Sequence, residues 1–177
     1  MKKKKLNQKY GTLFWITGLS GSGKTTIAKK IYSRIRKDYG PTIIISGDEI
    51  RKMFSLKGYT YNDRLKIVKK YCLLSKHITK NKVNIIISVI GMIDTLRAWN
   101  RKNINNYIEI YINSPIKYLK GRNKKKLYTK SKESVVGVNV MPEFPKKPDI
   151  KINNNFKTNT KDLSDILYKK IKEKFSY

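Results

Sequence analysis

The residues with the clearest chemical meaning form a glycine-rich segment near the N-terminus. Residues 18–25 read Gly-Leu-Ser-Gly-Ser-Gly-Lys-Thr, a G-x-x-x-x-G-K-T pattern typical of loops that bind the phosphates of a nucleoside triphosphate. In such a loop, backbone N–H groups surround phosphate oxygens, Lys24 reaches the β- and γ-phosphates, and the Thr25 hydroxyl ligates Mg²⁺. The chemistry predicted for this segment is phosphoryl transfer, and a glycine-rich turn without function is the alternative.

The elements on either side of this phosphate loop argue for the functional interpretation. An apolar run predicts a strand over 12–17, and apolar residues at helical spacing predict a helix over 25–36. The loop therefore joins a strand to a helix N-terminus, where N–H groups and the helix dipole favour bound anions. We assign ATP binding to the loop residues Gly18, Ser20, Gly21, Ser22, Gly23, Lys24, Thr25 and Thr26.

The remaining chain alternates between apolar strands and amphipathic helices. The patterns predict strands over 42–45, 83–90, 107–112 and 149–152 and helices over 63–80, 94–102 and 160–175. Ser114 and Pro115 are expected to be the N-cap and the first residue of one more helix. This alternation predicts an α/β fold with a doubly wound parallel sheet of about five strands. Asp48 follows the strand over 42–45, at the sheet edge where such folds bind ligands.

Length and composition suggest how the chain is organised. Its 177 residues suit a single domain over 1–177, preceded by a basic tail at 1–9. Residues 121–148 are basic, contain proline and lack periodicity, and this length is typical of an active-site lid. The alternative for 121–148 is a disordered insertion.

The only cysteine, the only histidine and the longest apolar stretch predict structural roles and argue against a membrane span. Cys72 is the only cysteine, and its place on an apolar helical face predicts a packing role in a reducing compartment. His77 is the only histidine, and we interpret it as structural or exposed. The apolar stretch over 83–93 is too short and too polar to span a membrane. We therefore expect a cytoplasmic enzyme without a membrane partner.

The charge of the chain favours a second class of function. Its formal net charge is +29, and such a field attracts nucleic acid. However, most of the cations are Lys spread along the chain, whereas guanine is read mainly by Arg. A basic, NTP-dependent nucleic-acid-binding protein is therefore the weaker alternative, and the field also suits small anionic substrates.

Six segments together resemble the adenylylsulfate kinase family. In chain order they are WITGLSGSGKTTIA, SGDEIR, GYTYNDR, IEIYINSP, KKLY and PEFPKKPDI, and they cover nearly the whole chain. The resemblance implies a three-layer P-loop kinase fold with a lid, and a homodimer, since the family is usually dimeric. It also implies transfer of the γ-phosphoryl group of ATP, with Mg²⁺, to the 3′-hydroxyl of adenosine 5′-phosphosulfate.

The resemblance also implies roles for particular residues. Asp48 corresponds to the carboxylate that helps to hold Mg²⁺ and orients or deprotonates the 3′-hydroxyl. The catalytic candidates are therefore Asp48 and Lys24. The candidate metal ligands are Thr25 and Asp48. The acceptor candidates are Arg51 and Arg64 for the 5′ anion, Tyr59 against the base, Ser88 near the transferred phosphate, and the lid residues Leu127 and Tyr128. The alternative for the two arginines is that they are surface charges. In the lid, Arg122 and Lys125 correspond to residues that cover ATP.

The chain departs from the family pattern mainly around the acceptor. Ile67 and Lys69 replace an Asn and an Arg, Gly91-Met92 replaces a Ser-Pro pair, and residues 134–139 replace a lid segment whose Phe closes on adenine. The lid resembles that of a side branch, found beside capsule-building enzymes, that includes a cytidine diphosphoramidate kinase. The expected acceptor is thus a small anionic nucleotide with an acidic 5′ cap, either adenylyl sulfate or cytidine diphosphoramidate.

Overall fold

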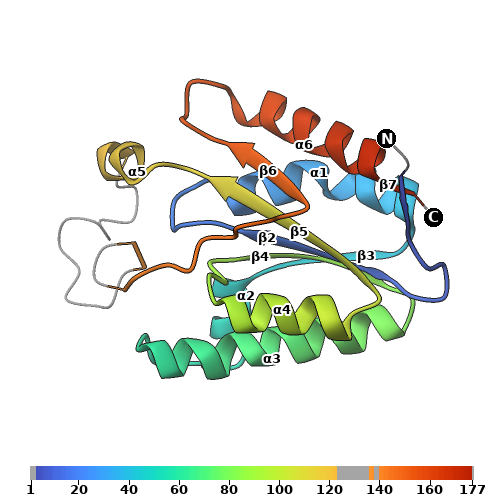
Figure 1. The fold of residues 1–177 in the computed structure, drawn as a ribbon, viewed down its shortest axis with the longest axis horizontal. Helices are drawn as coiled ribbons and strands as arrows, with labels where there is room; N and C mark the ends of the chain where they lie inside the picture. The colour runs from blue at the N-terminus through green and yellow to red at the C-terminus, as the bar shows by residue number, and fades with distance from the viewer. Residues whose placement is uncertain (1–2, 123–135, 138–139, 177) are drawn as a thin grey trace.

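The computed structural model describes residues 3–122, 136–137 and 140–176. Its central sheet has five parallel strands, in the spatial order β3 (Thr42–Ser46), β4 (Asn84–Val89), β2 (Thr12–Thr17), β5 (Asn106–Asn113) and β6 (Ile150–Asn153) (Figure 1). The chain builds β3 and β4 on one side of β2 and then crosses to build β5 and β6 on the other. This order confirms the predicted doubly wound parallel sheet.

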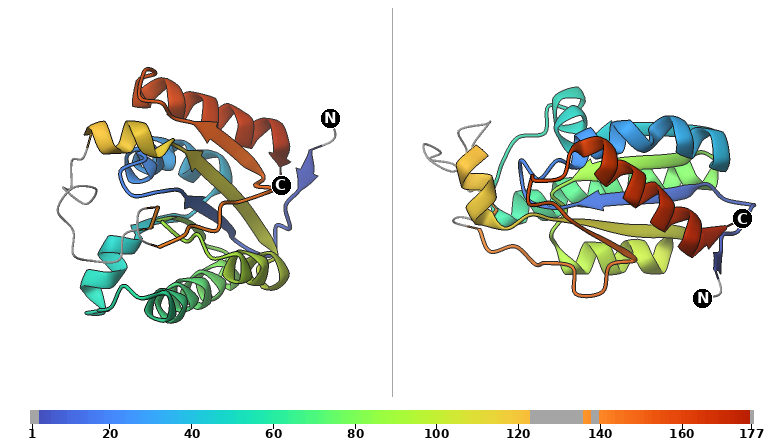
Figure 2. Two further views of the ribbon diagram at one scale, coloured as in Figure 1. Left: turned by 60° about the vertical axis from the view of Figure 1, so that its left-hand side comes forward. Right: turned by 90° about the horizontal axis from the view of Figure 1, so that it is seen from above.

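Helices cover both faces of the sheet and produce three layers (Figures 1 and 2). α1 (Lys24–Tyr39) and α6 (Thr160–Lys174) pack on one face, and α3 (Tyr61–Lys80) and α4 (Asp94–Asn103) pack on the other. Two short helices, α2 (Gly47–Met53) and α5 (Ile116–Arg122), follow the carboxyl ends of β3 and β5.

The central strand β2 is buried on both faces, and this burial explains its unbroken apolar run. Phe14 and Ile16 belong to a core cluster with side chains of α1 and α6, whereas Leu13 and Trp15 pack with side chains of α3 and α4. All four are 0% exposed. Successive side chains of a strand point to opposite faces, so a strand covered by helices on both faces must be apolar at every position.

The only cysteine and the only histidine of the sequence both lie on α3. Cys72 is buried in the core, and this burial raises the pKa of its thiol to about 12, which confirms a packing role. His77 lies on the exposed side of the helix, as expected. Within the described part of the chain, no helix is both long and apolar enough to cross a membrane.

Element boundaries differ from the predictions mainly where side chains cap helices. The segment after β3 forms α2, which was not predicted, because Ser46 and Glu49 make a capping box: the Ser46 hydroxyl accepts from Glu49 N, and Ser46 N donates to Glu49 Oε2 at 2.6 Å. The expected cap at Ser114 is wrong. The Ser114 hydroxyl is buried and has no hydrogen-bond partner among the described residues, and α5 begins at Ile116.

The two ends of the described chain meet in a small second sheet. β1 (Lys4–Lys5) pairs in parallel with β7 (Phe175–Ser176), so part of the predicted basic tail is an ordered strand. Leu6 N donates to Ser176 O at 2.6 Å, and the Leu6 side chain is buried in the core. The backbone is already extended at Phe175, and α6 therefore ends at Lys174.

Candidate functional site

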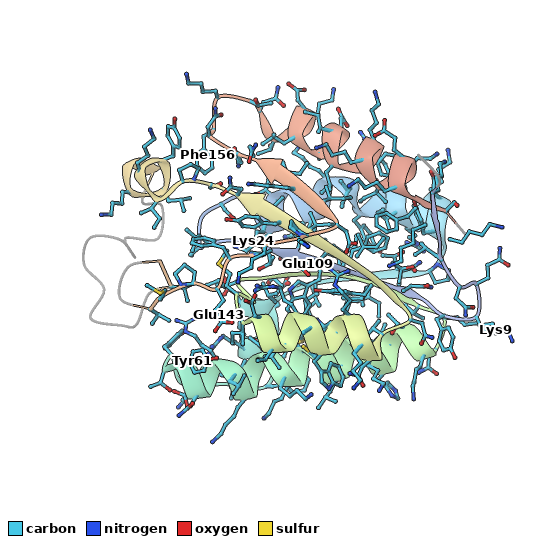
Figure 3. The ribbon with its side chains drawn as sticks, in the orientation of Figure 1. Lys9, Lys24, Tyr61, Glu109, Glu143 and Phe156 are labelled. Carbon is cyan, nitrogen blue, oxygen red and sulfur yellow. The ribbon has the colours of Figure 1, made fainter. Side chains whose placement is uncertain are left out.

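A cavity of about 580 Å³ opens at the carboxyl ends of the sheet strands. Its walls come from the phosphate loop, the ends of β3 and β4, helices α2 and α3, and the segments around residues 140 and 156. Figure 3 shows Lys24 between Phe156, near β6, and Tyr61, at the start of α3. The position is the one expected for a ligand site in an open α/β sheet.

The phosphate loop forms one wall of this cavity. Of the eight loop residues proposed to bind ATP, six line it, namely Ser20, Gly21, Gly23, Lys24, Thr25 and Thr26. Gly23 is the N-cap of α1 with φ of 91°, a conformation that favours glycine. The Lys24 side chain is buried and its Nζ donates to Leu19 O at 2.7 Å, so the cation is held across its own loop.

The two remaining loop residues, Gly18 and Ser22, do not line the cavity. Ser22 is 0% exposed, and its carbonyl accepts a hydrogen bond from Asn154 Nδ2 at 3.0 Å. Asn154 also accepts from Phe156 N through its side-chain oxygen at 3.0 Å. This buried amide ties the loop after β6 to the phosphate loop, and both Asn154 and Phe156 line the cavity.

Three oxygen-bearing side chains, one of them in the phosphate loop, line the cavity, namely Thr25, Asp48 and Ser88. Thr25 Oγ1 lies 3.0 Å from Ser88 Oγ, which joins the start of α1 to β4. Asp48, in the first turn of α2, lines the same cavity. The Ser46–Glu49 capping box that starts α2 also lowers the pKa of the Glu49 carboxyl, because the Ser46 hydroxyl and N–H both bond to it. The structure thus brings Thr25, Asp48 and Ser88 to one cavity.

The two predicted anion-binding arginines, Arg51 and Arg64, come from α2 and α3. Arg51 and Arg64 both line the cavity. Their guanidinium carbons lie 4.8 and 5.6 Å from the centre of the Tyr59 ring. Arg51 Nη1 donates to Leu56 O and Gly58 O, each at 3.1 Å, and Arg64 Nε donates to Tyr59 O at 2.9 Å. The backbone of this loop therefore fixes both cations near the cavity.

Tyr59, which was expected to face the acceptor base, is not among the described residues that line the cavity. Its ring supports the two guanidinium groups instead, and cation–π contacts of this kind are favourable. Tyr61, two residues later, does line the cavity. Because α3 begins at Tyr61, the helix turns this second ring towards the site. The sequence alone did not distinguish the two tyrosines.

Tyr71, in the helix predicted over 63–80, is a further cavity residue for which no functional role was predicted. Its hydroxyl donates to Gly47 O at 3.2 Å. Burial raises the pKa of Tyr71 to about 12, and of the two nearby charges Arg51 lowers this pKa and Asp48 raises it, each by less than burial does. The phenol is therefore protonated at neutral pH and lies close to the proposed catalytic carboxylate. Tyr71 falls at an apolar position of the helical pattern, so the sequence indicated a core residue and not a cavity residue.

The lid candidates fall largely outside the described residues. Lys125, Leu127 and Tyr128 lie beyond them, and the side chain of Arg122, at the end of α5, is not described. Of the predicted lid over 121–148, Val136, Val140 and Met141 line the cavity. Among the described residues, no three His, Cys, Asp or Glu side chains are grouped so that they could hold a metal ion by themselves.

Gly91, one of the departures from the family pattern, lies where the fold leaves no room for a side chain. A Cβ atom at Gly91 would lie 2.7 Å from the Trp15 ring, and the residue has φ of 51°. The Gly91-Met92 pair thus lets a core tryptophan approach the backbone of the cavity wall, where a side chain would collide with it.

Comparisons with known proteins agree with these features. The family model for adenylylsulphate kinase matches residues 10–153. A cytidine diphosphoramidate kinase of Campylobacter jejuni is 34% identical over 164 residues, which cover 90% of this chain and 95% of that protein. An adenylyl-sulfate kinase of Halothermothrix orenii is 28% identical over 166 residues, covering 91% and 89%.

A solved structure shows the same fold. The APS kinase of Mycobacterium tuberculosis, determined in complex with AMPPNP and APS, superposes with a TM-score of 0.81 at 21% identity. The superposition covers 92% of this chain and 98% of that one. The described elements therefore follow the three-layer arrangement of that kinase.

Proposed function

Because the chain belongs to the adenylylsulfate kinase family and is an ATP-dependent nucleotide kinase, we propose that it phosphorylates the 3′-hydroxyl of a nucleotide with an acidic 5′ cap. The observation that carries this proposal is the cavity itself. The phosphate loop, Asp48 and two arginines face one space, so a triphosphate and an anionic acceptor can meet there. The family match does not favour the alternative of a nucleic-acid-binding protein.

The phosphate loop is proposed to bind ATP. Its N–H groups and the N-terminus of α1 surround the phosphates, and Lys24 exchanges its bond to Leu19 O for the β- and γ-phosphate oxygens. Arg122 and Lys125 are proposed to cover the bound ATP, and Leu127 and Tyr128 the acceptor. We retain these four as predictions from the family pattern.

The oxygen ligands at the end of the loop suit a magnesium ion. Mg²⁺ takes hard oxygen ligands and usually binds through one or two carboxylates together with substrate phosphates and water. The Thr25 hydroxyl, with the Asp48 carboxylate in the same cavity, fits this pattern and is proposed to hold the ion. When bound, Mg²⁺ neutralises negative charge on the transferred phosphoryl group.

Asp48 is proposed to act on the acceptor hydroxyl. It orients the 3′-oxygen for in-line attack and accepts its proton as the new O–P bond forms and the bond between the γ-phosphorus and the β–γ bridging oxygen breaks. Ser88, 3.0 Å from the Thr25 hydroxyl, is proposed to contact the transferred group. Arg51 and Arg64 bind the 5′ anion, and their fixed position reduces the entropy lost on binding.

For the acceptor itself, we propose cytidine diphosphoramidate in capsule modification. The similarity to the Campylobacter jejuni enzyme supports it, together with Gly91-Met92 and the altered lid. The test is turnover of adenylyl sulfate and of cytidine diphosphoramidate under identical ATP and Mg²⁺. A higher kcat/KM for the cytidine nucleotide is expected. The opposite preference would contradict this acceptor, and inactivity with both would contradict the proposed function.

Three further proposals concern the whole protein. A cytoplasmic location, a homodimer and a single domain with a lid over 121–148 are expected from the sequence. Light scattering of the purified protein tests the homodimer, for which we expect twice the chain mass of 20.7 kDa.

A further inference from the structure

Of the two tyrosines among the described residues that line the cavity, Tyr71 is buried and Tyr61 is exposed. Tyr61 lines the cavity and is 47% exposed, so part of its side chain is available to a ligand. Arg51 and Arg64 can neutralise the anionic cap of the acceptor. A phenol ring cannot do so, but it offers a flat surface on which a nucleobase can stack. The chemistry of this wall therefore separates into a cationic part and an aromatic part.

A single carboxylate fixes the position of Tyr61. The Tyr61 hydroxyl donates to Glu143 Oε1 at 3.3 Å. The other oxygen, Glu143 Oε2, accepts from the backbone N–H of Asp94 at the start of α4. Glu143 thereby connects α3 to α4, and Figure 3 shows it beside Tyr61 below the sheet.

Glu143 itself is held by a buried anchor. Its carbonyl accepts from Arg97 Nη2 at 2.8 Å, and Arg97 is 4% exposed. Arg97 also donates to Gly91 O at 3.2 Å and pairs with the buried Glu109 through a 3.2 Å contact. Because the anchor joins α4, β5 and the cavity wall at Gly91, the segment that carries Glu143 has little freedom to move.

From this geometry we propose that Tyr61 determines acceptor specificity by contacting the base of the acceptor nucleotide, and that Glu143 is the residue that positions it. The inference rests on the proposed function, since it names the part of the acceptor that this wall recognises. The hydroxyl bond holds the ring in one orientation before the nucleotide binds. Holding the ring in advance reduces the entropy lost on binding, so the effect should appear in acceptor binding and not in the chemical step.

The test is a set of steady-state measurements with cytidine diphosphoramidate and ATP. We expect Tyr61→Ala to raise the acceptor KM by about 10-fold or more and to leave the ATP KM unchanged, which matches the loss of one base-stacking contact. Tyr61→Phe keeps the ring and should raise the acceptor KM by only about 3-fold. The matched control is Phe54→Ala, which removes an aromatic side chain that is 61% exposed and lies outside the cavity lining.

The role of Glu143 is tested by a double-mutant cycle. Glu143→Ala should raise the acceptor KM by about 3-fold with little change in kcat, and it should add nothing in the Tyr61→Ala background. Additive effects of the two substitutions would contradict the positioning role. An unchanged acceptor KM in Tyr61→Ala, or an equal rise in the ATP KM, would overturn the assignment of Tyr61.

Calorimetric titration with cytidine diphosphate, in the presence of a non-hydrolysable ATP analogue, separates this inference from the proposed function. We expect the wild-type protein to bind the nucleotide and Tyr61→Ala to bind it about 10-fold more weakly. Binding without any turnover by the wild type would contradict the proposed function and still test Tyr61. Equal affinity of the wild type and Tyr61→Ala would contradict the inference alone, and no binding by the wild type would overturn both.

Discussion

The two halves of the cavity are built in different ways. The donor half, formed by the phosphate loop with Asn154 and Phe156, consists largely of backbone groups and buried polar side chains that bond to one another. The proposed acceptor half, formed by Arg51, Tyr61, Arg64 and Tyr71, consists of side chains projecting from two helices, α2 and α3.

This difference indicates which half can change its ligand. Backbone N–H groups and the loop lysine bind the phosphates of any nucleoside triphosphate in the same way, so the donor half has little freedom to change its ligand. In the acceptor half, each contact depends on a side chain that a single substitution replaces. We therefore expect substitutions in the donor half to abolish activity or stability, and those in the acceptor half to change affinity and specificity.

The largest effect is expected from Lys24→Ala, in the donor half. Loss of the cation that faces the β- and γ-phosphates should lower kcat by about 1,000-fold, comparable to the largest losses for one transition-state contact. Single-turnover kinetics with saturating ATP measure this loss. The control is Lys30→Ala, an exposed cation on the same helix, for which normal turnover is expected.

Asp48→Asn, at the boundary between the halves, is expected to lower kcat by about 100-fold or more, because the amide cannot accept the proton of the 3′-hydroxyl. The ATP affinity should change little if the loop dominates donor binding. Rapid-quench measurement of the first turnover tests the effect on chemistry. Normal turnover in Asp48→Asn would refute the role assigned to this carboxylate.

Arg51→Ala isolates the acceptor half. Removal of a charge-assisted hydrogen bond to the 5′ anion should raise the acceptor KM by about 10-fold while the ATP KM stays constant. Initial rates at varied concentrations of each substrate give the two constants separately. Arg34→Ala removes a surface guanidinium paired with Asp165 and should change neither constant. A parallel rise in both KM values for Arg51→Ala would contradict the division into halves.

Asn154→Ala should affect stability more than turnover. The substitution leaves Ser22 O and Phe156 N without their buried partner, and this typically costs about 1–3 kcal/mol in the free energy of unfolding. Urea denaturation followed by circular dichroism measures the change. An unaltered midpoint would show that the bond between the two loops does not stabilise the donor half.

The smallest effect is expected from Glu49→Gln, and it depends on pH. The bonds from Ser46 lower the pKa of Glu49 in the folded state below its ordinary value. The ionised carboxylate therefore contributes stability above the unfolded pKa, and this contribution is lost as the pH falls through the folded pKa. Thermal melts from pH 7 to pH 3 should show a shallower fall in stability for Glu49→Gln than for the wild type. Parallel curves would indicate that the capping box carries no charge effect.

Much of the fold was predictable because its determinants are local. The strand over residues 12–17 was predicted with the bounds that the structure has, since an unbroken apolar run of this length leads into a glycine-rich loop. The short helix α2 was missed because it is too short to show periodicity, although Ser46 and Glu49 carry the capping-box signature three residues apart.

Within the site, the structure brings several predicted residues together, whereas the positions of two tyrosines were not predicted. The structure places Thr25, Asp48, Ser88 and the two arginines around one cavity, as the family pattern implied. Tyr59 contacts the two guanidinium groups and lies outside the described cavity lining, so its expected contact with the base stays a prediction. Tyr59 and Tyr61 are both tyrosines in one short segment, and which ring faces the cavity depends on where α3 begins and on what packs against the loop.

By itself, the sequence determined the phosphate loop, the alternation of the main strands and helices and the kinase family, because these depend on residues close together in the chain or on patterns of apolar residues. Only the tertiary structure decided which side chains complete the cavity. Glu143 meets Tyr61 across 82 positions and Asn154 meets Ser22 across 132. No local pattern encodes such contacts, because they form only when the folded sheet brings the carboxyl ends of its strands and the connecting loops to one edge.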